Sequence, residues 1–273
     1  MKVITFFSEK GGTGKTTLTL LMASYLAYER GERVFVMDCD YPSYQFSKMR
    51  ETDVSMLVPE NRDFIRAVGT NVPYRIGQIK AQPSFSQAEL ERIAESLKAQ
   101  TKGDGYFFLD LPGRFLPTDP AYHLMFRGLV DLVVFPVDSD RQSRSSALFV
   151  GDLLRSDAFR KSSGKKDGQQ MCVLWNRETQ RERIGKKDWY DVPTRTFESV
   201  GMPVIGQRVH DILIARRDPN TFGFIRSTLC WPKQNIRRQA PYLETVFEEI
   251  KLRADGKWNE KARRRLYGET QND

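Results

Sequence analysis

The chain has 273 residues, a mean hydropathy of −0.53 and a net charge of +8, a size that fits one large α/β domain or two smaller ones at roughly 150 residues per domain. Its most apolar stretches, around residues 20–27 and 129–137, are far shorter than the ~20 residues of a bilayer span, and the N-terminus meets a glycine cluster too early for a secretory signal. Cys39, Cys172 and Cys230 are too widely separated for a disulfide framework or a CxxC metal site. We therefore expect a cytoplasmic protein in a reducing compartment.

The positive charge is concentrated in the second half of the chain. Residues 1–140 carry 16 Lys and Arg against 18 Asp and Glu, a net charge of −2, which leaves 27 against 17, a net charge of +10, for residues 141–273. This asymmetry favours a polyanionic partner, nucleic acid before membrane, because the basic residues do not lie on an obvious amphipathic helix. A solvated basic surface is the alternative.

The N-terminal elements form a βαβ unit. A β-branched, apolar run at residues 3–7 predicts a strand, and a glycine turn follows it. Residues 18–31 have apolar positions at helical spacing, and residues 33–37 predict the next strand, with acidic residues at its carboxyl end.

The same alternation continues along the chain. Further strands are predicted at residues 106–111, 132–137, 171–175 and 204–209. Helix-length segments are found at residues 86–102, 119–128, 141–158, 186–200 and 235–253. Residues 41–85 have no clear period and are expected to form a helical excursion, and residues 160–170 are expected to form a basic loop.

Alternating strands and helices predict an α/β fold with a mostly parallel sheet and helices on both faces. We find no linker or repeat, so residues 1–253 are expected to form a single domain and residues 254–273 a basic polar tail. Such sheets bind ligands in the crevice at the carboxyl ends of their strands.

The first strand and helix are joined by a phosphate-loop sequence, KGGTGKTT. The nucleotide-binding candidates are Lys10, Gly11, Gly12, Thr13, Gly14, Lys15, Thr16 and Thr17. Glycines let successive N–H groups point inward at phosphate oxygens, and the following helix adds the positive end of its dipole. The lysine in GKT would bridge the β- and γ-phosphates. A glycine turn with an incidental lysine is the alternative.

The loop departs from the strict GxxxxGK[ST] pattern, whose first glycine falls on Glu9. With a lysine ahead of its glycines, KGGTGKT resembles the deviant Walker A box of the ParA/MinD superfamily. VFVMDCD, YFFLDLPG and VLWNR resemble, in the same order, the DxD segment, the Walker B strand and the strand before an adenine-contacting asparagine. The resemblance covers roughly residues 1–215, and the whole looks most like the ParA-type TraA proteins of Bacteroidetes conjugative elements.

This resemblance implies a P-loop ATPase that binds ATP with Mg²⁺ and hydrolyses it slowly. It assigns catalytic roles to Lys10, Lys15 and Asp40. The lysine corresponding to Lys10 reaches the ATP of a partner subunit across a nucleotide sandwich dimer, and the carboxylate corresponding to Asp40 positions the attacking water. The family pattern DxDPQ is not kept after Asp40, so the hydrolysis rate and its trigger stay open.

The resemblance also implies a metal site and a base contact. Thr16, Asp38 and Asp110 are the residues expected at the Mg²⁺ site. Asn176 is the expected adenine contact, although an asparagine after a strand is also an ordinary turn former.

The function implied is an ATP-dependent dimerising switch that binds DNA without sequence preference, for partition, maintenance or conjugative transfer of a mobile element. Its partners would be DNA of the nucleoid, a second copy of the chain and a ParB-like adaptor, without stable membrane binding. The candidate DNA contacts are Arg216, Arg217, Arg237 and Arg238. A MinD-like membrane-positioning ATPase and a metabolic ATP-dependent enzyme on the same scaffold are the alternatives.

Overall fold

The computed structural model describes residues 1–79, 86–114, 120–185, 188–211 and 226–268. Six strands form one sheet in the order β3-β2-β4-β1-β5-β6, and every neighbouring pair is parallel. The strands are β1 (Lys2–Phe6), β2 (Val34–Asp38), β3 (Arg75–Gln78), β4 (Tyr106–Asp110), β5 (Leu132–Val137) and β6 (Gln170–Trp175). The predicted α/β class with a parallel sheet is confirmed.

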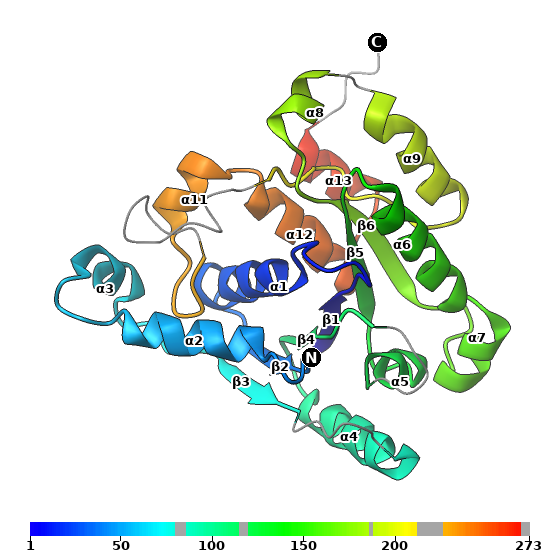
Figure 1. Ribbon diagram of the computed structural model, residues 1–273, viewed down its shortest axis with the longest axis horizontal. Helices are drawn as coiled ribbons and strands as arrows, with labels where there is room; N and C mark the ends of the chain where they lie inside the picture. The colour runs from blue at the N-terminus through cyan, green and yellow to red at the C-terminus, as the bar shows by residue number, and fades with distance from the viewer. Residues whose placement is uncertain (80–85, 115–119, 186–187, 212–225, 269–273) are drawn as a thin grey trace.

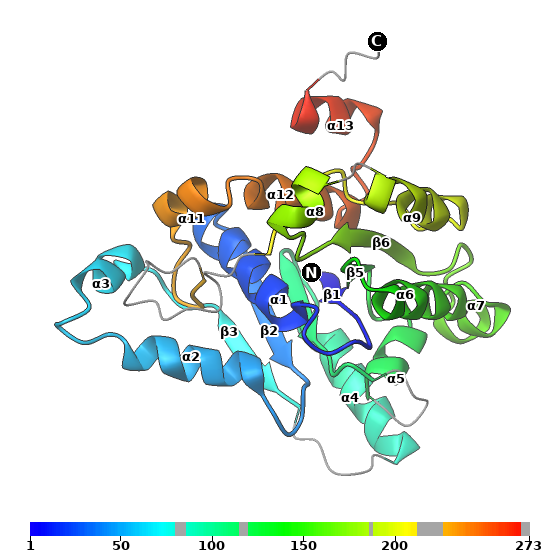
Figure 2. The same cartoon turned by 45° about the horizontal axis from the view of Figure 1, so that its top comes forward.

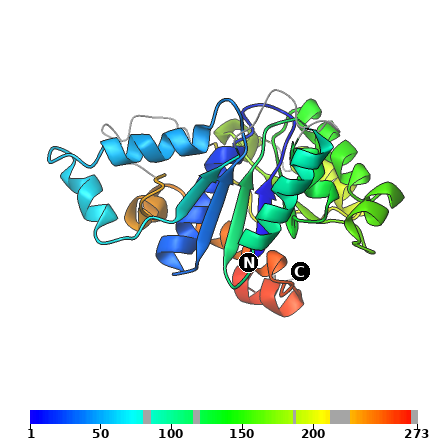
Figure 3. The same cartoon turned by 90° about the horizontal axis from the view of Figure 1, so that it is seen from below.

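Helices cover both faces of this sheet (Figure 1). The described helices are α1 (Lys15–Ser24), continued by the π-helical turn η1 (Tyr25–Glu29), α2 (Gln45–Ser55), α3 (Arg62–Val68), α4 (Gln87–Gln100), α5 (Pro120–Phe126), α6 (Arg141–Leu153), α7 (Asp157–Ser163), α8 (Gln180–Gly185), α9 (Asp188–Ser199), α11 (Lys233–Gln239), α12 (Leu243–Ala254) and α13 (Glu260–Tyr267). Figures 2 and 3 show α1 and α4 on opposite sides of the strands. None of the helices in the described residues is long and apolar enough to cross a membrane.

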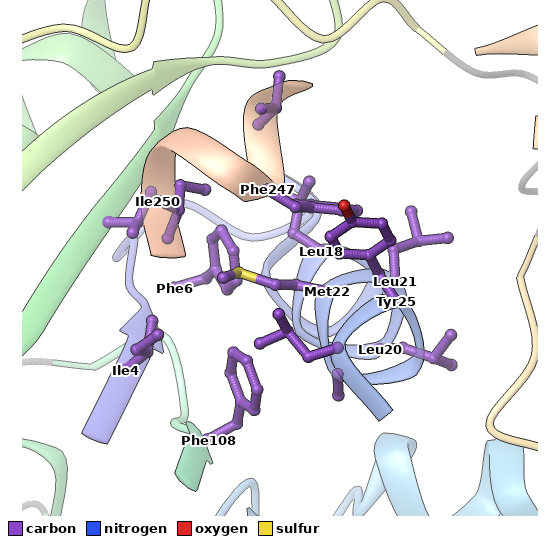
Figure 4. Close-up of a cluster of buried hydrophobic side chains, with 14 of the residues drawn as sticks. Ile4, Phe6, Leu18, Leu20, Leu21, Met22, Tyr25, Phe108, Phe247 and Ile250 are labelled. Carbon is purple, nitrogen blue, oxygen red and sulfur yellow. The ribbon is translucent and has the colours of Figure 1, made fainter. Parts of the chain in front are cut away.

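Two apolar layers hold the helices to the sheet. On one face, Met22 of α1 and Phe247 of α12 pack with Phe6 of β1 and Phe108 of β4, and all four are fully buried (Figure 4). On the other face, α4, α5, α6, α7 and α9 contribute buried residues to a second cluster. The long apolar runs seen in sequence are thus strands buried on both faces.

The edges of the sheet differ from the sequence prediction. Within the expected helical excursion, β3 pairs with β2. The strand predicted at residues 204–209 is wrong: Val204 forms only an isolated bridge with Val173. This segment still follows β6, since the Ile205 and Val209 amides donate to the carbonyls of Val173 and Trp175. Between them the Gly206 amide donates to Glu249 Oε2 at 3.1 Å, so it does not continue the ladder.

Several helix boundaries also differ. The helix predicted at 141–158 divides into α6 and α7, because Ser156 caps a new helix by accepting from the Phe159 amide. Part of the predicted basic loop at 160–170 therefore belongs to α7. The helix predicted at 235–253 divides into α11 and α12 around Pro241. The tail contains α13, whose Tyr267 hydroxyl donates to the buried carboxylate of Glu249 on α12.

The contribution of α12 to the core can be measured. Phe247→Ala should lower the free energy of unfolding by about 3–5 kcal/mol, because it leaves a cavity where α12 meets α1. Val72→Ala is the control, since Val72 is 86% exposed and its truncation should change stability by no more than about 0.5 kcal/mol. Urea denaturation gives both values. A Phe247→Ala protein as stable as this control would contradict the assignment of α12 to the core.

Candidate nucleotide site

The predicted phosphate loop lies between β1 and α1 at the carboxyl edge of the sheet. Gly12 and Gly14 have φ of +74° and +91°, a left-handed conformation that favours glycine. Gly14 caps α1, and its carbonyl accepts from the Leu18 amide at 2.8 Å. The loop backbone therefore runs directly into a helix N-terminus, where phosphate groups bind readily.

Lys15 is the first residue of α1 and points back along the loop. Its Nζ lies 3.4 Å from the carbonyl oxygen of Lys10. Burial lowers its pKa, while the nearby carboxyls of Asp110 and Asp40 oppose that change. A partly desolvated ammonium at this point would gain by contact with phosphate oxygens.

Asp110 ends β4, the neighbour of β1, and is fully buried. Within the described residues neither of its carboxylate oxygens accepts a well-formed hydrogen bond, and the Thr16 hydroxyl is the nearby group that could donate to it. Burial and the nearby charge of Asp38 raise its pKa to about 8, and the Thr16 hydroxyl opposes this rise. A buried carboxyl without a partner is unfavourable when charged, so this position favours a cation.

Asp38 is the last residue of β2, and Asp40 lies just beyond it. In the sheet, β4 separates β2 from β1. The fully buried Asp38 carboxylate accepts from the amide and hydroxyl of Ser47 at 2.9 and 2.8 Å, and from the Asp40 amide at 3.3 Å. Burial raises its pKa, and the Ser47 hydrogen bonds oppose that shift. The Asp40 carboxylate accepts from Ser43 Oγ at 2.5 Å. Asp38 thus holds the start of α2, and Asp40 stays at the rim.

Lys10 is engaged by its own chain. Its Nζ lies 2.9 Å from Asp138 Oδ2 and 3.1 Å from Asp140 Oδ2, just beyond the end of β5. These two carboxylates raise the Lys10 pKa against the lowering effect of desolvation. The preceding residue, Glu9, is also bound by the segment after β5, because its carboxylate accepts from Ser146 Oγ of α6 at 2.7 Å.

Asn176 and Arg177 follow β6 and reach the phosphate loop from the side. Asn176 Nδ2 donates to the Thr13 carbonyl at 2.6 Å, and Arg177 Nη1 donates to the Gly12 carbonyl at 2.9 Å. The Asn176 side chain is buried and Arg177 is half-buried. The structure therefore places Asn176 at the loop, as expected for a nucleotide-site residue, while its predicted contact with adenine stays a prediction.

Gly113 is a site residue that the sequence analysis missed. A Cβ at this position would lie 3.1 Å from Lys15 Nζ and 3.3 Å from the carbonyl oxygens of Glu9 and Ser8. The chain after Asp110 thus passes directly against the phosphate loop. The glycine of DLPG was the only signal in the sequence, and a single glycine does not identify its neighbour.

The predicted DNA contacts lie apart from these residues. Arg237 and Arg238 are exposed in the last turn of α11. Trp231, just before α11, packs edge-on against Tyr25 at a ring distance of 5.2 Å, so α11 lies beyond the carboxyl end of α1, away from the loop (Figure 1). Arg216 and Arg217 fall outside the described residues.

The residues fit the Mg²⁺ that the family resemblance implies. The unpartnered carboxylate of Asp110 and the hydroxyl of Thr16 are oxygen donors of the kind Mg²⁺ prefers. No group of three or more His, Cys, Asp or Glu residues in the described parts of the chain is arranged to hold a metal alone. Mg²⁺ commonly takes one or two protein ligands and completes its shell with phosphates and water.

Comparisons with known proteins agree with this geometry. The family model described as CbiA, the CobQ/CobB/MinD/ParA nucleotide binding domain, matches residues 4–252. A comparison with curated protein sequences finds no match.

Three solved structures illustrate the fold. A variant McdA of Cyanothece in complex with ATP has a TM-score of 0.61 at 17% identity, covering 95% of this chain and 98% of its own. MinD of Pyrococcus horikoshii with Mg-ADP has a TM-score of 0.58 at 17% identity, covering 94% and 99%. A putative plasmid partition protein of Borrelia burgdorferi bound to AMPPNP has a TM-score of 0.56 at 16% identity, covering 91% and 99%.

The buried state of Asp110 predicts a pH dependence. The unfolded carboxyl has a pKa of about 3.9, so between that value and about 8 the folded protein holds the proton more tightly. The free energy of unfolding contributed by this group therefore falls as the pH rises through that window. Asp110→Asn removes the titration and should flatten the decline, measured by urea denaturation with EDTA at about pH 5.5 and about pH 8.

The same variant gives an independent measurement on the metal. In wild type, Mg²⁺ should strengthen ADP binding in calorimetry, and Asp110→Asn should lose most of that gain. Equal pH slopes and equal Mg²⁺ effects in the two proteins would contradict the interpretation of Asp110 as an unpaired cation ligand.

Proposed function

Because the chain belongs to the CobQ/CobB/MinD/ParA nucleotide-binding family, we propose that it is a slow, Mg²⁺-dependent ATPase of the ParA type that dimerises on ATP and separates after hydrolysis. The observation that carries this proposal is the unpartnered, fully buried Asp110 beside a glycine loop that leads into α1. A cation and a polyphosphate together would satisfy both features.

In this proposal Lys15 contacts the β- and γ-phosphates, and the loop amides from Gly11 to Thr17 surround them. Thr16 and Asp110 hold the Mg²⁺, which neutralises phosphate charge. Asp38 supports that site indirectly by fixing the start of α2 through Ser47.

Asp40 orients the attacking water. Its carboxylate is already restrained by the Ser43 hydroxyl and lies at the rim, near Lys15. Asn176, held at the Thr13 carbonyl, contacts the adenine base. A carboxamide can both donate to and accept from the edge of adenine.

Lys10 acts on the nucleotide of a second subunit. In the single chain its ammonium is bound by Asp138 and Asp140, so it does not serve its own phosphate site. A partner facing the loop would offer phosphates in place of these carboxylates. The added cation would stabilise charge that redistributes when the phosphoryl group leaves.

The exposed arginines of α11, together with Arg216 and Arg217, bind DNA phosphates without reading sequence. Dimerisation doubles the number of contacts, so DNA binding becomes dependent on ATP. We place the protein at the nucleoid, with a ParB-like adaptor as trigger, in partition, maintenance or conjugative transfer of a mobile element.

The membrane alternative has less support. The aromatic residues of the C-terminal segment face the protein, because Tyr267 donates to Glu249 and Trp258 lies under Arg253 at 4.8 Å. The exposed residues of α13 are mainly charged. This helix therefore offers little apolar surface to a bilayer.

The role of Lys10 is tested by removing it. Lys10→Ala should bind ATP with wild-type affinity yet stay monomeric by light scattering with ATP, and its DNA-stimulated hydrolysis should fall roughly a thousandfold, the lower end for a cation supplied in trans. The matched control is the double substitution Asp138→Asn and Asp140→Asn, which breaks the internal ion pairs but keeps the lysine and the α6 cap. This control should dimerise with ATP. If the control and Lys10→Ala were equally defective, the lysine would act within its own chain.

The DNA surface is tested by reversing two charges on α11. Replacing Arg237 and Arg238 by Glu should weaken binding alike on unrelated duplexes and reduce the salt slope, log Kd against log salt concentration, by about two. The control replaces Arg263 and Arg264 of α13, which already pair with Glu260, by Glu. Fluorescence anisotropy over a salt series measures both. Equal losses of DNA affinity in the two proteins would indicate that only the net charge matters. An ATP hydrolysis rate that does not change with DNA would favour the metabolic alternative.

A further inference from the structure

Arg177 contacts the phosphate loop, although no motif of the sequence assigns it a role there. Its guanidinium Nη1 donates to the Gly12 carbonyl at 2.9 Å. Its backbone has φ of +64°, a left-handed conformation that is uncommon for a residue other than glycine. Such a conformation persists when the surroundings impose it, and it is often found at functional sites.

The neighbouring residues impose this conformation. Glu178, the next residue, is buried and accepts from Arg208 Nη1 at 2.8 Å, with His210 Nε2 at 3.2 Å. Its backbone amide donates to the Val209 carbonyl, and its carbonyl accepts from the Asp211 amide. On the other side, the Asn176 amide donates to the Val137 carbonyl of β5. The turn at Arg177 is thus fixed at both ends.

The two loop carbonyls that Arg177 and Asn176 hold determine the direction of two amides. In a trans peptide the carbonyl of one residue and the N–H of the next point in opposite directions. The Gly12 carbonyl shares its peptide plane with the Thr13 N–H, and the Thr13 carbonyl shares its plane with the Gly14 N–H. Holding these carbonyls outward therefore turns both N–H groups towards the inside of the loop.

Gly14 matches this arrangement. A Cβ there would lie 2.8 Å from Asn176 Nδ2, so only glycine admits the carboxamide at the Thr13 carbonyl. A Cβ on Gly12 would lie 3.9 Å from Arg177 Nη1. The glycines of the loop thus accommodate donors on its outer side as well as phosphates on its inner side.

We infer that Arg177 is a positioning residue for phosphate binding, which orders the loop before nucleotide arrives by fixing the peptide that presents the Thr13 amide. This inference rests on the proposed nucleotide-binding function. Because Arg177 acts through the loop and not on the base, it contributes equally to the binding of any nucleoside diphosphate or triphosphate.

The test replaces Arg177 by Asn, which tolerates the left-handed conformation but is too short to reach Gly12. ADP, ATP and GTP affinities measured by calorimetry should each fall by a similar factor, roughly tenfold, as expected for one hydrogen bond from a charged donor. Amide hydrogen exchange in the nucleotide-free protein should accelerate at Thr13 and Gly14. The control Arg181→Asn removes the same charge from an exposed position of α8 without touching the loop or the residues that fix the Arg177 turn, and it should change neither measurement.

Other outcomes would overturn the inference. Loss confined to ATP and ADP, with GTP unchanged, would make Arg177 a base contact, and loss confined to triphosphates would make it a γ-phosphate contact. Unchanged exchange and affinity would remove any role for it. If wild type bound no nucleotide, the proposed function would fail, whereas the exchange measurement would still report on the loop.

Discussion

The structure depends on one backbone requirement: a loop whose amides surround phosphate must turn its carbonyls outward, and those carbonyls need donors. The fold meets this requirement because β1 lies at the centre of the sheet, between β4 and β5, with β6 next in order. Asn176 and Arg177, at the end of β6, reach the outer side of the loop. Gly113, just past β4, packs against Lys15. The glycine motif allows the loop conformation, and residues distant in sequence hold the loop in it.

In the single chain, some charged groups of the site have partners of opposite charge or hydrogen bonds, and others do not. At the rim, Lys10 has two carboxylate partners. In the interior, the Asp110 carboxylate accepts no well-formed hydrogen bond from the part of the chain that the structure describes, and Lys15 is partly desolvated. Groups left without partners are costly in a low-dielectric interior and give large gains once a ligand supplies them. The energetic reason to bind a metal nucleotide therefore lies at β4 and α1. In the proposed dimer, the reason to engage a second subunit lies at Lys10, which would exchange its contacts with Asp138 and Asp140 for the partner's phosphates.

The sequence predicts what depends on contiguous residues. Strands such as β1, β4 and β5 are uninterrupted apolar runs, which the sequence predicts. A short glycine motif marks the loop between β1 and α1, whose binding of phosphate stays a prediction. β3 was missed because its four residues, Arg75–Gln78, carry little apolar pattern and gain stability only by pairing with β2. The segment at 204–209 has the composition of a strand, but the Gly206 amide donates to the Glu249 carboxylate of α12 and leaves the ladder with β6. Arg177 and Gly113 contact segments that are distant in sequence, and one sequence does not show which residues they meet.

Tertiary contacts at both ends of α2 also connect the nucleotide site to the segment before α11. Asp38 holds Ser47 at the start of α2, and near the other end of α2 Asp53 accepts from the amide and hydroxyl of Thr228, both at 2.6 Å. Thr228 precedes the segment that leads to the arginines of α11. One helix therefore joins the loop that carries Asp40 to the proposed DNA surface. Such a connection transmits a signal only when the helix has two positions that nucleotide and DNA favour unequally. Because Ser47 donates to Asp38, which also accepts from the Asp40 amide, a rearrangement of the Asp40 loop on nucleotide binding would reach α2 through this contact.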